Sequence, residues 1–365
     1  MQKLVDKSKT NECRISYLTI DRFDDFFKFN QKIYPKLQSL KNLKERFCHQ
    51  VFNNPLVEDK SKPPVLVAYN KENQIIGQLL GNPFELYVGN NCKKVFYNYG
   101  FYVLKEYREA GIGTRLAKLF VKDFKFFLTV GVGPMSKNIN LSFGSIVANM
   151  YKFIWFKNLF SLIKAISSPM LKRKWFFNSN KFNYSVEFPK SILWKDFKFN
   201  LVNSLDSWED SPWDDKTLKF KRSLEFINWH FLKNPAKYFF YLLDSSKSKA
   251  YFVARKCIYR EMNFLEIVDY NVMQNDREAF NAILNVAKEL VKKFRYEGVI
   301  TTSTNVFFDR LLMRNHFLKN KNPEVVMTNV TGNSSRYDIE KRDLVYVTKT
   351  DEILGLIYDP AFEIN

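Results

Sequence analysis

The sequence predicts an α/β (α+β) protein made of two consecutive units, each a twisted, mixed, mostly antiparallel sheet flanked by helices. Its 365 residues suit two domains, since one domain usually takes about 100–200 residues. Strand-like and helix-like periodicities alternate along residues 15–157, and the same order recurs along residues 238–348. With 36 Phe, 19 Tyr and 6 Trp, the chain has enough apolar surface for a core in each unit. We expect the first unit at residues 1–175, the second at 176–350 and a C-terminal tail at 351–365.

The first unit is predicted to run strand, two helices, three strands, helix, strand, helix. A polar turn at residues 70–74 joins two of the strands as a hairpin, and Pro35 separates the first two helices. Apolar residues that recur at helical spacing mark the helices. The predicted strands are residues 15–20, 65–69, a β-rich stretch from 75, 95–104 and 126–132, and the predicted helices are residues 21–34, 36–52, 112–124 and 141–157.

The second unit is predicted to begin with three strands around two turns. A helix follows, with Asp276 as its expected N-cap and apolar residues from Phe280 to Phe294 along one face. A strand and a last helix come next, and two more strands around a polar loop would close the unit. The predicted strands are residues 238–243, 250–257, 264–272, 298–304, 325–330 and 344–348, and the last helix is residues 306–316.

The charge of the chain is strongly positive. It contains 57 Lys or Arg against 38 Asp or Glu, a formal net charge of +19. Such a field attracts anionic ligands such as phosphates, nucleic acid or acidic lipid headgroups. The chain is also rich in Asn, Phe, Ile and Tyr, as an A/T-rich coding sequence would produce, so codon bias is an equally good explanation of the charge.

Several classes of protein are not favoured by the sequence. The four cysteines lie far apart without a Cys-x-x-Cys pair and the chain has only three histidines, so no metal site is expected. The N-terminus lacks the apolar stretch of a secretory signal. The most apolar run, residues 153–166, contains Lys157 and Lys164 and is shorter than the about 20 residues that cross a bilayer. We therefore expect a cytoplasmic protein.

The most informative segment is a turn with two glycines that opens directly into a helix, at residues 103–116. Gly111 and Gly113 permit a positive φ and a close approach of the backbone, so successive N–H groups can converge on one anion. The helix N-terminus adds partial positive charge, and Arg108 and Arg115 lie nearby in the sequence. The segment therefore predicts a phosphate or pyrophosphate site. It is neither a Walker A loop nor a dinucleotide fingerprint, which needs a third glycine where this chain has Leu116.

The spacing Arg108-x-x-Gly111-x-Gly113, after a strand and before an amphipathic helix, resembles the acyl-CoA pyrophosphate motif of the GNAT superfamily of N-acetyltransferases. The resemblance covers about residues 15–160. Those enzymes commonly carry Ala-x-x-x-Tyr-x-x-x-Gly-Phe on the helix after their fifth strand. The run from Val147 to Phe156 has Tyr151 and the final Phe in register, but Trp155 replaces the glycine.

This resemblance implies acetyl-CoA, or another acyl-CoA, as donor substrate of an N-acyltransferase, with no metal. The pantetheine arm would pair like an extra strand with the third strand's end, and the pyrophosphate would bind the turn and helix start. The implied CoA-binding residues are Phe101, Tyr102, Val103, Arg108, Glu109, Ala110, Gly111, Ile112, Gly113 and Thr114.

The resemblance also implies the chemistry. A neutral amine attacks the thioester, a backbone amide stabilises the oxyanion, and the departing thiolate is protonated. Tyr151 is the candidate acid and Glu85 the nearest carboxylate for a general base. Tyr97, Tyr99 or a chain of waters are alternatives to Glu85, and packing in the core is the alternative role for Tyr151.

The second half has no glycine at the corresponding junction, residues 269–278, so a second CoA site is not expected. The arrangement is similar to tandem GNAT proteins in which the second half is a substrate platform. Residues 222–235 resemble bacterial two-domain members of cell-surface glycan biosynthesis, which implies an amino sugar or glycan-linked amine as acceptor, whereas we interpret His230 as a packing or capping residue. Residues 151–200 contain ten Lys or Arg, with only Glu187 and Asp196 as acids.

That basic, aromatic segment fits an anionic substrate, a membrane surface or single-stranded nucleic acid, or is a solvated linker face. Two other functions stay open. A tandem-GNAT aminoacyl transferase would use charged tRNA as donor, which suits the charge but not the glycine loop. A catalytically inactive CoA-binding or membrane-surface module would keep the loop alone. The acceptor, the acyl chain length, the general base and the oligomeric state are not determined by the sequence.

Overall fold

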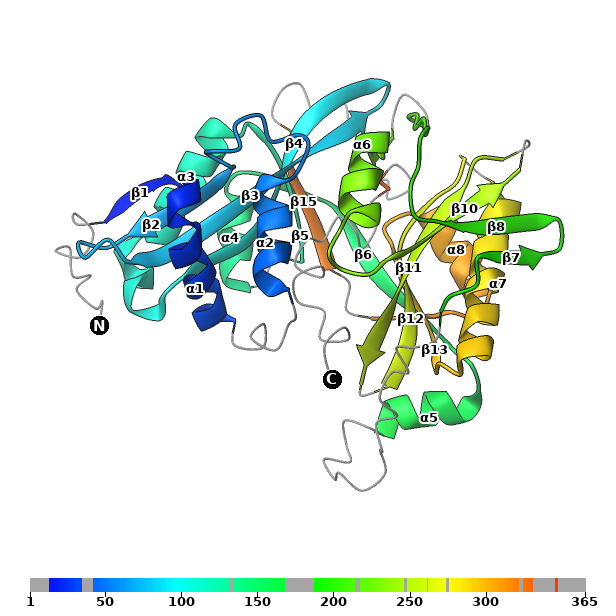
Figure 1. Cartoon of the computed structure of the whole chain (residues 1–365). Helices are drawn as coiled ribbons and strands as arrows, with labels where there is room; N and C mark the ends of the chain where they lie inside the picture. The colour runs from blue at the N-terminus through cyan, green and yellow to red at the C-terminus, as the bar shows by residue number, and fades with distance from the viewer. Residues whose placement is uncertain are drawn as a thin grey trace.

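The computed structural model describes residues 13–34, 42–131, 134–167, 187–213, 217–245, 248–260, 262–273, 276–321, 324–330 and 345–346. Figure 1 shows two α/β halves joined by strands that run from one into the other. The sheet order is β1-β2-β3-β4-β5-β15-β6-β13-β12-β11-β10-β8-β7, so a path of hydrogen-bonded strands crosses the whole molecule. The mixed, mostly antiparallel sheets with flanking helices confirm the predicted fold class.

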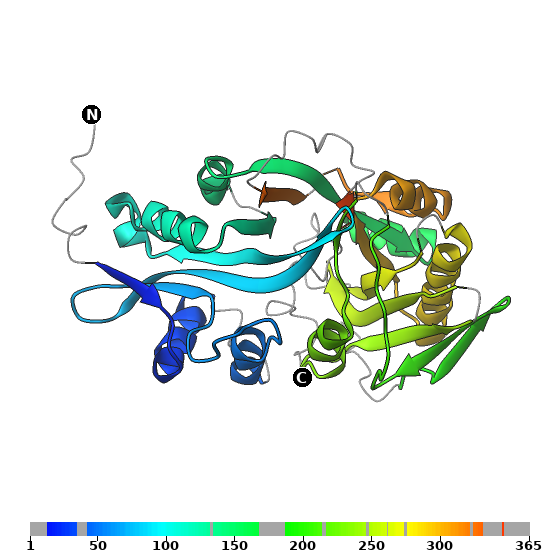
Figure 2. The same cartoon turned by 90° about the horizontal axis from the view of Figure 1, so that it is seen from above.

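The first half holds the earlier strands and four helices. Its elements are β1 (Arg14–Tyr17), α1 (Phe23–Ile33), α2 (Leu43–Phe52), β2 (Val65–Tyr69), β3 (Ile75–Val88), β4 (Asn91–Val103), α3 (Ile112–Asp123), β5 (Phe126–Val130), α4 (Pro134–Leu141) and β6 (Ser145–Phe156). Helices α1 and α2 cover one face of the sheet and α3 the other, as the view from above shows (Figure 2). Each face therefore has its own apolar core.

The second half repeats part of this plan. Its elements are α5 (Leu159–Ser167), β7 (Ser191–Trp194), β8 (Phe197–Val202), β9 (Leu218–Phe220), α6 (Leu224–Ile227), a π-helical turn (Asn228–Leu232), β10 (Phe239–Asp244), β11 (Tyr251–Tyr259), β12 (Met262–Asn271), α7 (Arg277–Phe294), β13 (Gly298–Ser303), α8 (Val306–Arg314), β14 (Leu318–Lys319), β15 (Glu324–Val330) and β16 (Val345–Tyr346). Asp276 caps α7 as predicted, because its carboxylate accepts from the Ala279 N–H at 2.9 Å.

The predicted helix at residues 141–157 is wrong, because most of this run forms strand β6. The helix of this region is the short α4, which ends at Leu141. Strand β6 pairs with β15 along residues 145–150 and with β13 along residues 151–156, and its side chains Val147, Ala148, Met150, Phe153 and Ile154 are buried. A strand buried in this way has a nearly continuous apolar sequence, which periodicity alone does not distinguish from a buried helix.

Strand β15 confirms the predicted strand at residues 325–330 but lies in the first sheet. It pairs with β5 and with β6, both antiparallel, and separates them. Likewise β9 pairs with β3 of the first half. The first sheet thus includes strands from beyond residue 175, and the predicted domain boundaries stay a prediction. Of the strand expected at residues 344–348, only 345–346 lie within the described residues, and the tail at 351–365 lies outside them.

Candidate functional site

Strands β4 and β5 form a fork. They run parallel, and in the described chain their ladder has two register pairs, Phe96 with Phe127 and Tyr97 with Leu128. At the next position the Thr129 hydroxyl donates to the Asn98 carbonyl at 3.0 Å, so a side chain replaces the backbone ladder. Because β4 continues to Val103, no strand among the described residues pairs with its β5-facing edge beyond this point. Such an edge offers backbone N–H and C=O groups to an extended ligand.

A β-bulge lies just past the fork. Gly100 and Phe101 of β4 stand opposite Leu79 of β3, and Gly100 has φ +59°. A Cβ at Gly100 would come to 3.0 Å from a Leu80 methyl group, so both the backbone angle and the space favour glycine here. Bulges of this kind turn the strand and change which side chains face which side.

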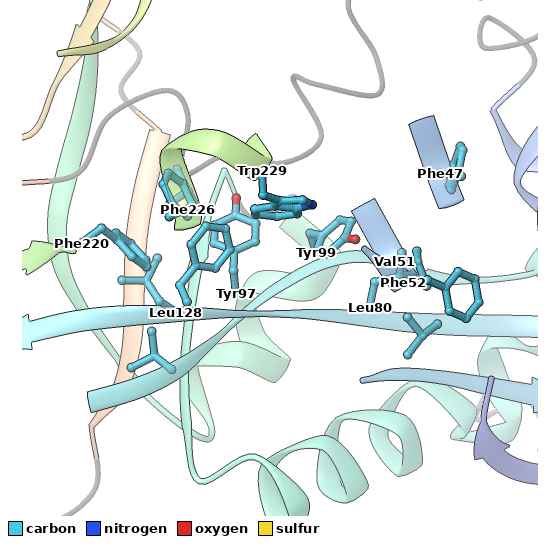
Figure 3. Packing of buried hydrophobic residues seen from close by; sticks show 14 of the residues in the cluster. Phe47, Val51, Phe52, Leu80, Tyr97, Tyr99, Leu128, Phe220, Phe226 and Trp229 are labelled. Atoms are coloured by element: carbon cyan, nitrogen blue, oxygen red, sulfur yellow. The ribbon is translucent and has the colours of Figure 1, made fainter. Parts of the chain in front are cut away.

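The bulge changes the face of the sheet on which the odd-numbered side chains of β4 lie. Tyr97 and Tyr99 belong to the core on the α1–α2 face, whereas Val103 packs on the α3 face. In Figure 3 the Trp229 ring lies beside Tyr97 and Tyr99. Burial raises the pKa of Tyr99 above its usual value, so its hydroxyl stays protonated at neutral pH.

The predicted anion loop lies at the end of the same strand. Residues Lys105–Ala110 form a 3₁₀ turn, and Gly111 precedes α3 with φ +70°. The N-cap residue of α3, Gly111, has no side chain that could cap the helix, and the first turn contains no acidic residue. The N–H groups of a helix's first turn have no acceptor within the helix, and Gly111 and Thr114 at this helix start are exposed.

Three neighbouring groups complete the loop. The Arg108 guanidinium donates to the Val103 carbonyl at 3.0 Å and lies 5.5 Å from the Tyr102 ring centroid, which holds a cation beside the strand end. Arg115 donates to the Cys13 carbonyl at 3.2 Å. A Cβ at Gly113 would lie 3.3 Å from the Phe101 ring, so this glycine allows α3 to approach β4 closely.

The predicted CoA residues therefore lie on one strand, turn and helix start. The positions are Phe101, Tyr102 and Val103 at the end of β4, Arg108, Glu109 and Ala110 in the turn, and Gly111, Ile112, Gly113 and Thr114 at the start of α3. Ala110 and Ile112 are buried and anchor the loop to the α3 core, Gly113 is half-buried against β4, and Gly111 and Thr114 are exposed.

A buried polar cluster at the fork was not found from the sequence. The Asn98 amide donates to the Asn140 side-chain oxygen on α4 at 3.4 Å, and the Thr129 hydroxyl bonds the Asn98 carbonyl. All three residues are less than 8% exposed. The signal that was available is Asn98 itself, a polar residue within the otherwise aromatic run at residues 95–101.

The two predicted catalytic side chains lie away from the fork. Tyr151 is on β6, paired with Ser303, and the Lys319 ammonium is 3.6 Å from its ring centroid. Because β5 and β15 lie between β4 and β6, Tyr151 is about 14 Å across the sheet from β4. Glu85 is four residues along β3 from Gly81, the partner of Asn98, about 13 Å away. It is ion-paired with Lys221 at 3.0 Å.

A groove of about 1230 Å³ opens on the α1–α2 face. Its lining includes four carboxylates and two lysines, Asp21, Asp24, Glu45, Glu225, Lys44 and Lys233. Its floor includes a reciprocal pair: His49 Nε2–H donates to the Trp229 carbonyl at 2.9 Å and the Trp229 indole N–H donates to the His49 carbonyl at 3.2 Å. Desolvation lowers the pKa of His49, which keeps the ring neutral. The groove's net negative charge, in a protein of charge +19, suits a protonated amine.

The segment at residues 222–235 is mainly structural. Arg222 forms a bidentate pair with Asp269 at 3.0 and 3.1 Å, and the Tyr251 hydroxyl donates to the same carboxylate at 2.7 Å. His230 is fully buried and stacks on Phe226 at 4.8 Å, and burial lowers its pKa well below the usual value. A neutral imidazole inside an aromatic cluster is a packing residue, as we expected.

Among the described residues, no group of three or more His, Cys, Asp or Glu side chains is arranged to hold a metal ion. None of their helices is both long enough and apolar enough to cross a bilayer.

Comparison with known proteins shows a family match in the first half of the chain and a similar fold in several solved structures. Residues 23–130 match the acetyltransferase (GNAT) family, whereas no curated protein matches the chain. Similar solved structures include Saccharomyces cerevisiae N-myristoyltransferase with bound myristoyl-CoA, at 12% identity and a TM-score of 0.52, covering 87% of this chain and 82% of that one. A GCN5-related N-acetyltransferase from Anabaena variabilis has 11% identity and a TM-score of 0.52, covering 87% and 72%. A probable N-acyltransferase from Enterococcus faecalis has 10% identity and a TM-score of 0.52, covering 87% and 71%.

Proposed function

We propose that this chain, which has the GNAT fold and the family's pattern at residues 23–130, is an acyl-CoA-dependent N-acyltransferase. One observation carries the proposal. The fork between β4 and β5 and the uncapped start of α3 lie on one continuous segment, so a ligand with an extended arm and a pyrophosphate would meet both at once. Acetyl-CoA is the expected donor. The similarity to a structure with bound myristoyl-CoA makes a longer acyl chain the first alternative.

In the proposed complex, the pyrophosphate accepts hydrogen bonds from the first amides of α3, and Arg108 is the nearby cation. The pantetheine arm adds to the open edge of β4 past the fork, where residues 101–103 end the strand. Its thioester would then lie near Asn98. The acceptor's neutral amine nitrogen forms a bond to the thioester carbonyl carbon and the C–S bond breaks. The nitrogen loses a proton and the thiolate takes one up, which gives an amide and free CoA thiol.

The proposed acceptor is an amine, in particular an amino sugar or a glycan-linked amine. The groove beside His49 and Trp229 supports a cationic acceptor, since it carries more carboxylates than lysines. Tyr151 as general acid and Glu85 as general base stay predictions, because both lie more than about 10 Å from the fork by strand geometry. The second half is proposed to be a platform without CoA. A cytoplasmic location also stays a prediction.

Calorimetric titration with CoA and a thiol-release assay test this function together. We expect one CoA per chain and release of free thiol from acetyl-CoA in the presence of a suitable amine, with amino sugars, polyamines and peptides as the panel. Two equivalent sites per chain would contradict the proposed role of the second half. Tight CoA binding without release for any amine and any acyl length would instead support an inactive CoA-binding module. Binding of charged tRNA without CoA binding would support the aminoacyl transferase.

A further inference from the structure

Helix α5 (Leu159–Ser167) buries its small side chains and exposes its large apolar ones. Its buried positions are small, with Ser161 0% and Ala165 2% exposed. Its large apolar side chains face outward, in a set that recurs at helical spacing: Leu159 69%, Phe160 73%, Ile163 53% and Ile166 57% exposed. An amphipathic surface helix normally buries the large apolar face instead.

Polar contacts hold the helix in this orientation. The Ser161 hydroxyl donates to Glu297 at 2.6 Å, and the Lys164 ammonium is 3.3 Å from the same carboxylate. At the C-terminal end, Arg260 donates to the Ala165 carbonyl at 2.6 Å. Rolling α5 to bury its apolar face would break all of these contacts. The exposed face is therefore a fixed feature of the surface.

The apolar face is concentrated. Of the eleven large apolar side chains exposed in the described residues, four lie on this nine-residue helix. The others are spread over several elements, such as Leu193 on β7 and Met313 on α8. Single exposed apolar residues are ordinary, whereas a contiguous patch marks an interaction surface. Figure 1 shows α5 at the lower edge of the second half, with its outer side clear of other helices and strands.

The charge of the sequence on either side of this helix indicates the kind of partner. Between Asp123 and Glu187 the sequence contains nine Lys or Arg and no Asp or Glu, and α5 lies in the middle of this stretch. A second copy of this chain carries the same charge of +19 and would be repelled. An anionic lipid bilayer offers both an apolar interior for the side chains and negative headgroups for the lysines.

We propose that α5 docks the protein on an anionic membrane surface, lying in the interface with Leu159, Phe160, Ile163 and Ile166 directed into the lipid. The helix does not span the bilayer, since nine residues are less than half of what a span requires. Binding combines buried apolar area with attraction between lysines and headgroups, and both contributions are needed for a helix this short.

Sedimentation with unilamellar vesicles tests the proposal on the full chain. The wild type is expected to bind vesicles of phosphatidylcholine with about 30% phosphatidylserine, to bind less at high salt, and to bind pure phosphatidylcholine weakly. The double variant Phe160→Ser/Ile163→Ser should lose at least about tenfold in affinity. Leu193→Ser is the matched control, because Leu193 is 68% exposed but on β7, and it should bind like the wild type.

Thermal melting and CoA titration of each variant show that the fold and the first half are intact, so that a lost affinity reflects the helix face. The proposal fails if the wild type does not bind anionic vesicles, or if the double variant binds as well as the wild type. It also fails if the wild type is a dimer in light scattering and the double variant a monomer, because the face would then cover a second copy.

Discussion

The junction from β4 to α3 and the junction from β12 to α7 share one framework. In each, a parallel pair of strands separates after two or three register pairs. In each, a threonine at the first separated position donates to the opposite strand: Thr129 to the Asn98 carbonyl at 3.0 Å, and Thr301 to the Ile267 carbonyl at 3.2 Å. The two forks therefore correspond residue by residue, although the sequences around them differ.

The two helices that follow the forks differ in the acidic side chains at their N-termini. Helix α3 begins after Gly111, without a side-chain cap and without an acid in its first turn. Helix α7 begins after Asp276, whose carboxylate accepts from the Ala279 N–H, and Glu278 lies in its first turn. The first helix start can receive an external anion, whereas the second is already satisfied by the chain's own carboxylates.

The side chains that lie at the two forks also differ. In the second fork the fully buried Tyr270 spans the gap and donates to the Thr302 carbonyl at 3.3 Å. On β12, Asp269 is held by Arg222 and Tyr251. At the apex of the first fork lie the Asn98–Asn140 amide contact and the hydrogen bond from the Thr129 hydroxyl to the Asn98 carbonyl. The same framework thus carries a buried ion pair and a tyrosine hydrogen bond at the second fork, and uncharged amide and hydroxyl contacts at the first.

The largest effect on stability is expected in the second fork. Asp269→Ala leaves the Arg222 guanidinium buried without its carboxylate, which should lower the free energy of unfolding by about 3–5 kcal/mol. Urea denaturation measures this change. If the variant does not fold, Tyr251→Phe removes one hydrogen bond to Asp269 and should cost about 1 kcal/mol. A negligible loss in both variants would remove the structural role assigned to this fork.

The largest effect on binding is expected at the first helix start. Gly111→Asp places a negative charge where we propose that the pyrophosphate binds, and we expect CoA affinity to fall at least about 100-fold, or about 2.7 kcal/mol. A Cβ at Gly111 meets no atom within 4 Å, so the change adds backbone strain at φ +70° but no steric clash, and Asp tolerates this left-handed conformation better than most residues. Calorimetry gives the affinity.

Met273→Asp is the matched control for that charge. Met273 is 55% exposed and lies just after β12, in the corresponding junction of the second half. The control should bind CoA as the wild type does. Equal affinity of both variants would show that CoA binds elsewhere and would break the comparison.

A smaller effect is expected at the second helix start. Asp276→Ala removes the cap of α7 and should destabilise the protein by about 1 kcal/mol. It should not create a second CoA site, because the junction still lacks glycines. Melting temperature and binding stoichiometry are the two measurements. A stoichiometry that rises to two would mean that the cap alone excludes CoA from this half.

The smallest effect is expected for Tyr151→Phe. If Tyr151 were the acid, turnover should fall by about 10²–10⁴ while CoA binding is retained. Its place on β6, two strands from β5, favours a loss of less than tenfold. Tyr99→Phe, one residue past Asn98 and with a protonated hydroxyl, is the comparison in the same thiol-release assay. A loss above 100-fold in Tyr151→Phe would restore it as the acid.

The sequence predicted the anion loop because its signal is local. Arg108, Gly111 and Gly113 are close in the chain, and the positive φ at Gly111 is a property of one residue. The two amide residues at the fork apex are 42 positions apart, and no spacing rule connects them. Their contact depends on where α4 ends, which the erroneous helix at residues 141–157 had obscured.

The pairing of the strands was the other feature that the sequence did not predict. The apolar run of β6 fits both a buried helix and a buried strand, and its pairing with β13 and β15 decides between them. Those partners lie more than 140 residues later in the chain. The existence of β15 was predictable from its own residues, whereas its insertion between β5 and β6 is a property of the folded molecule.

The position of β15 has a consequence for how the protein is made. During synthesis, residues 1–175 leave the ribosome long before residues 324–330. The edges of β5 and β6 that pair with β15 therefore lack this partner until the end of the chain is made. Unpaired strand edges in such an intermediate are prone to pair with other chains. The nascent first half is therefore expected to depend on chaperones, and expressed alone it should aggregate, whereas adding a peptide of the β15 sequence should improve its yield in soluble form.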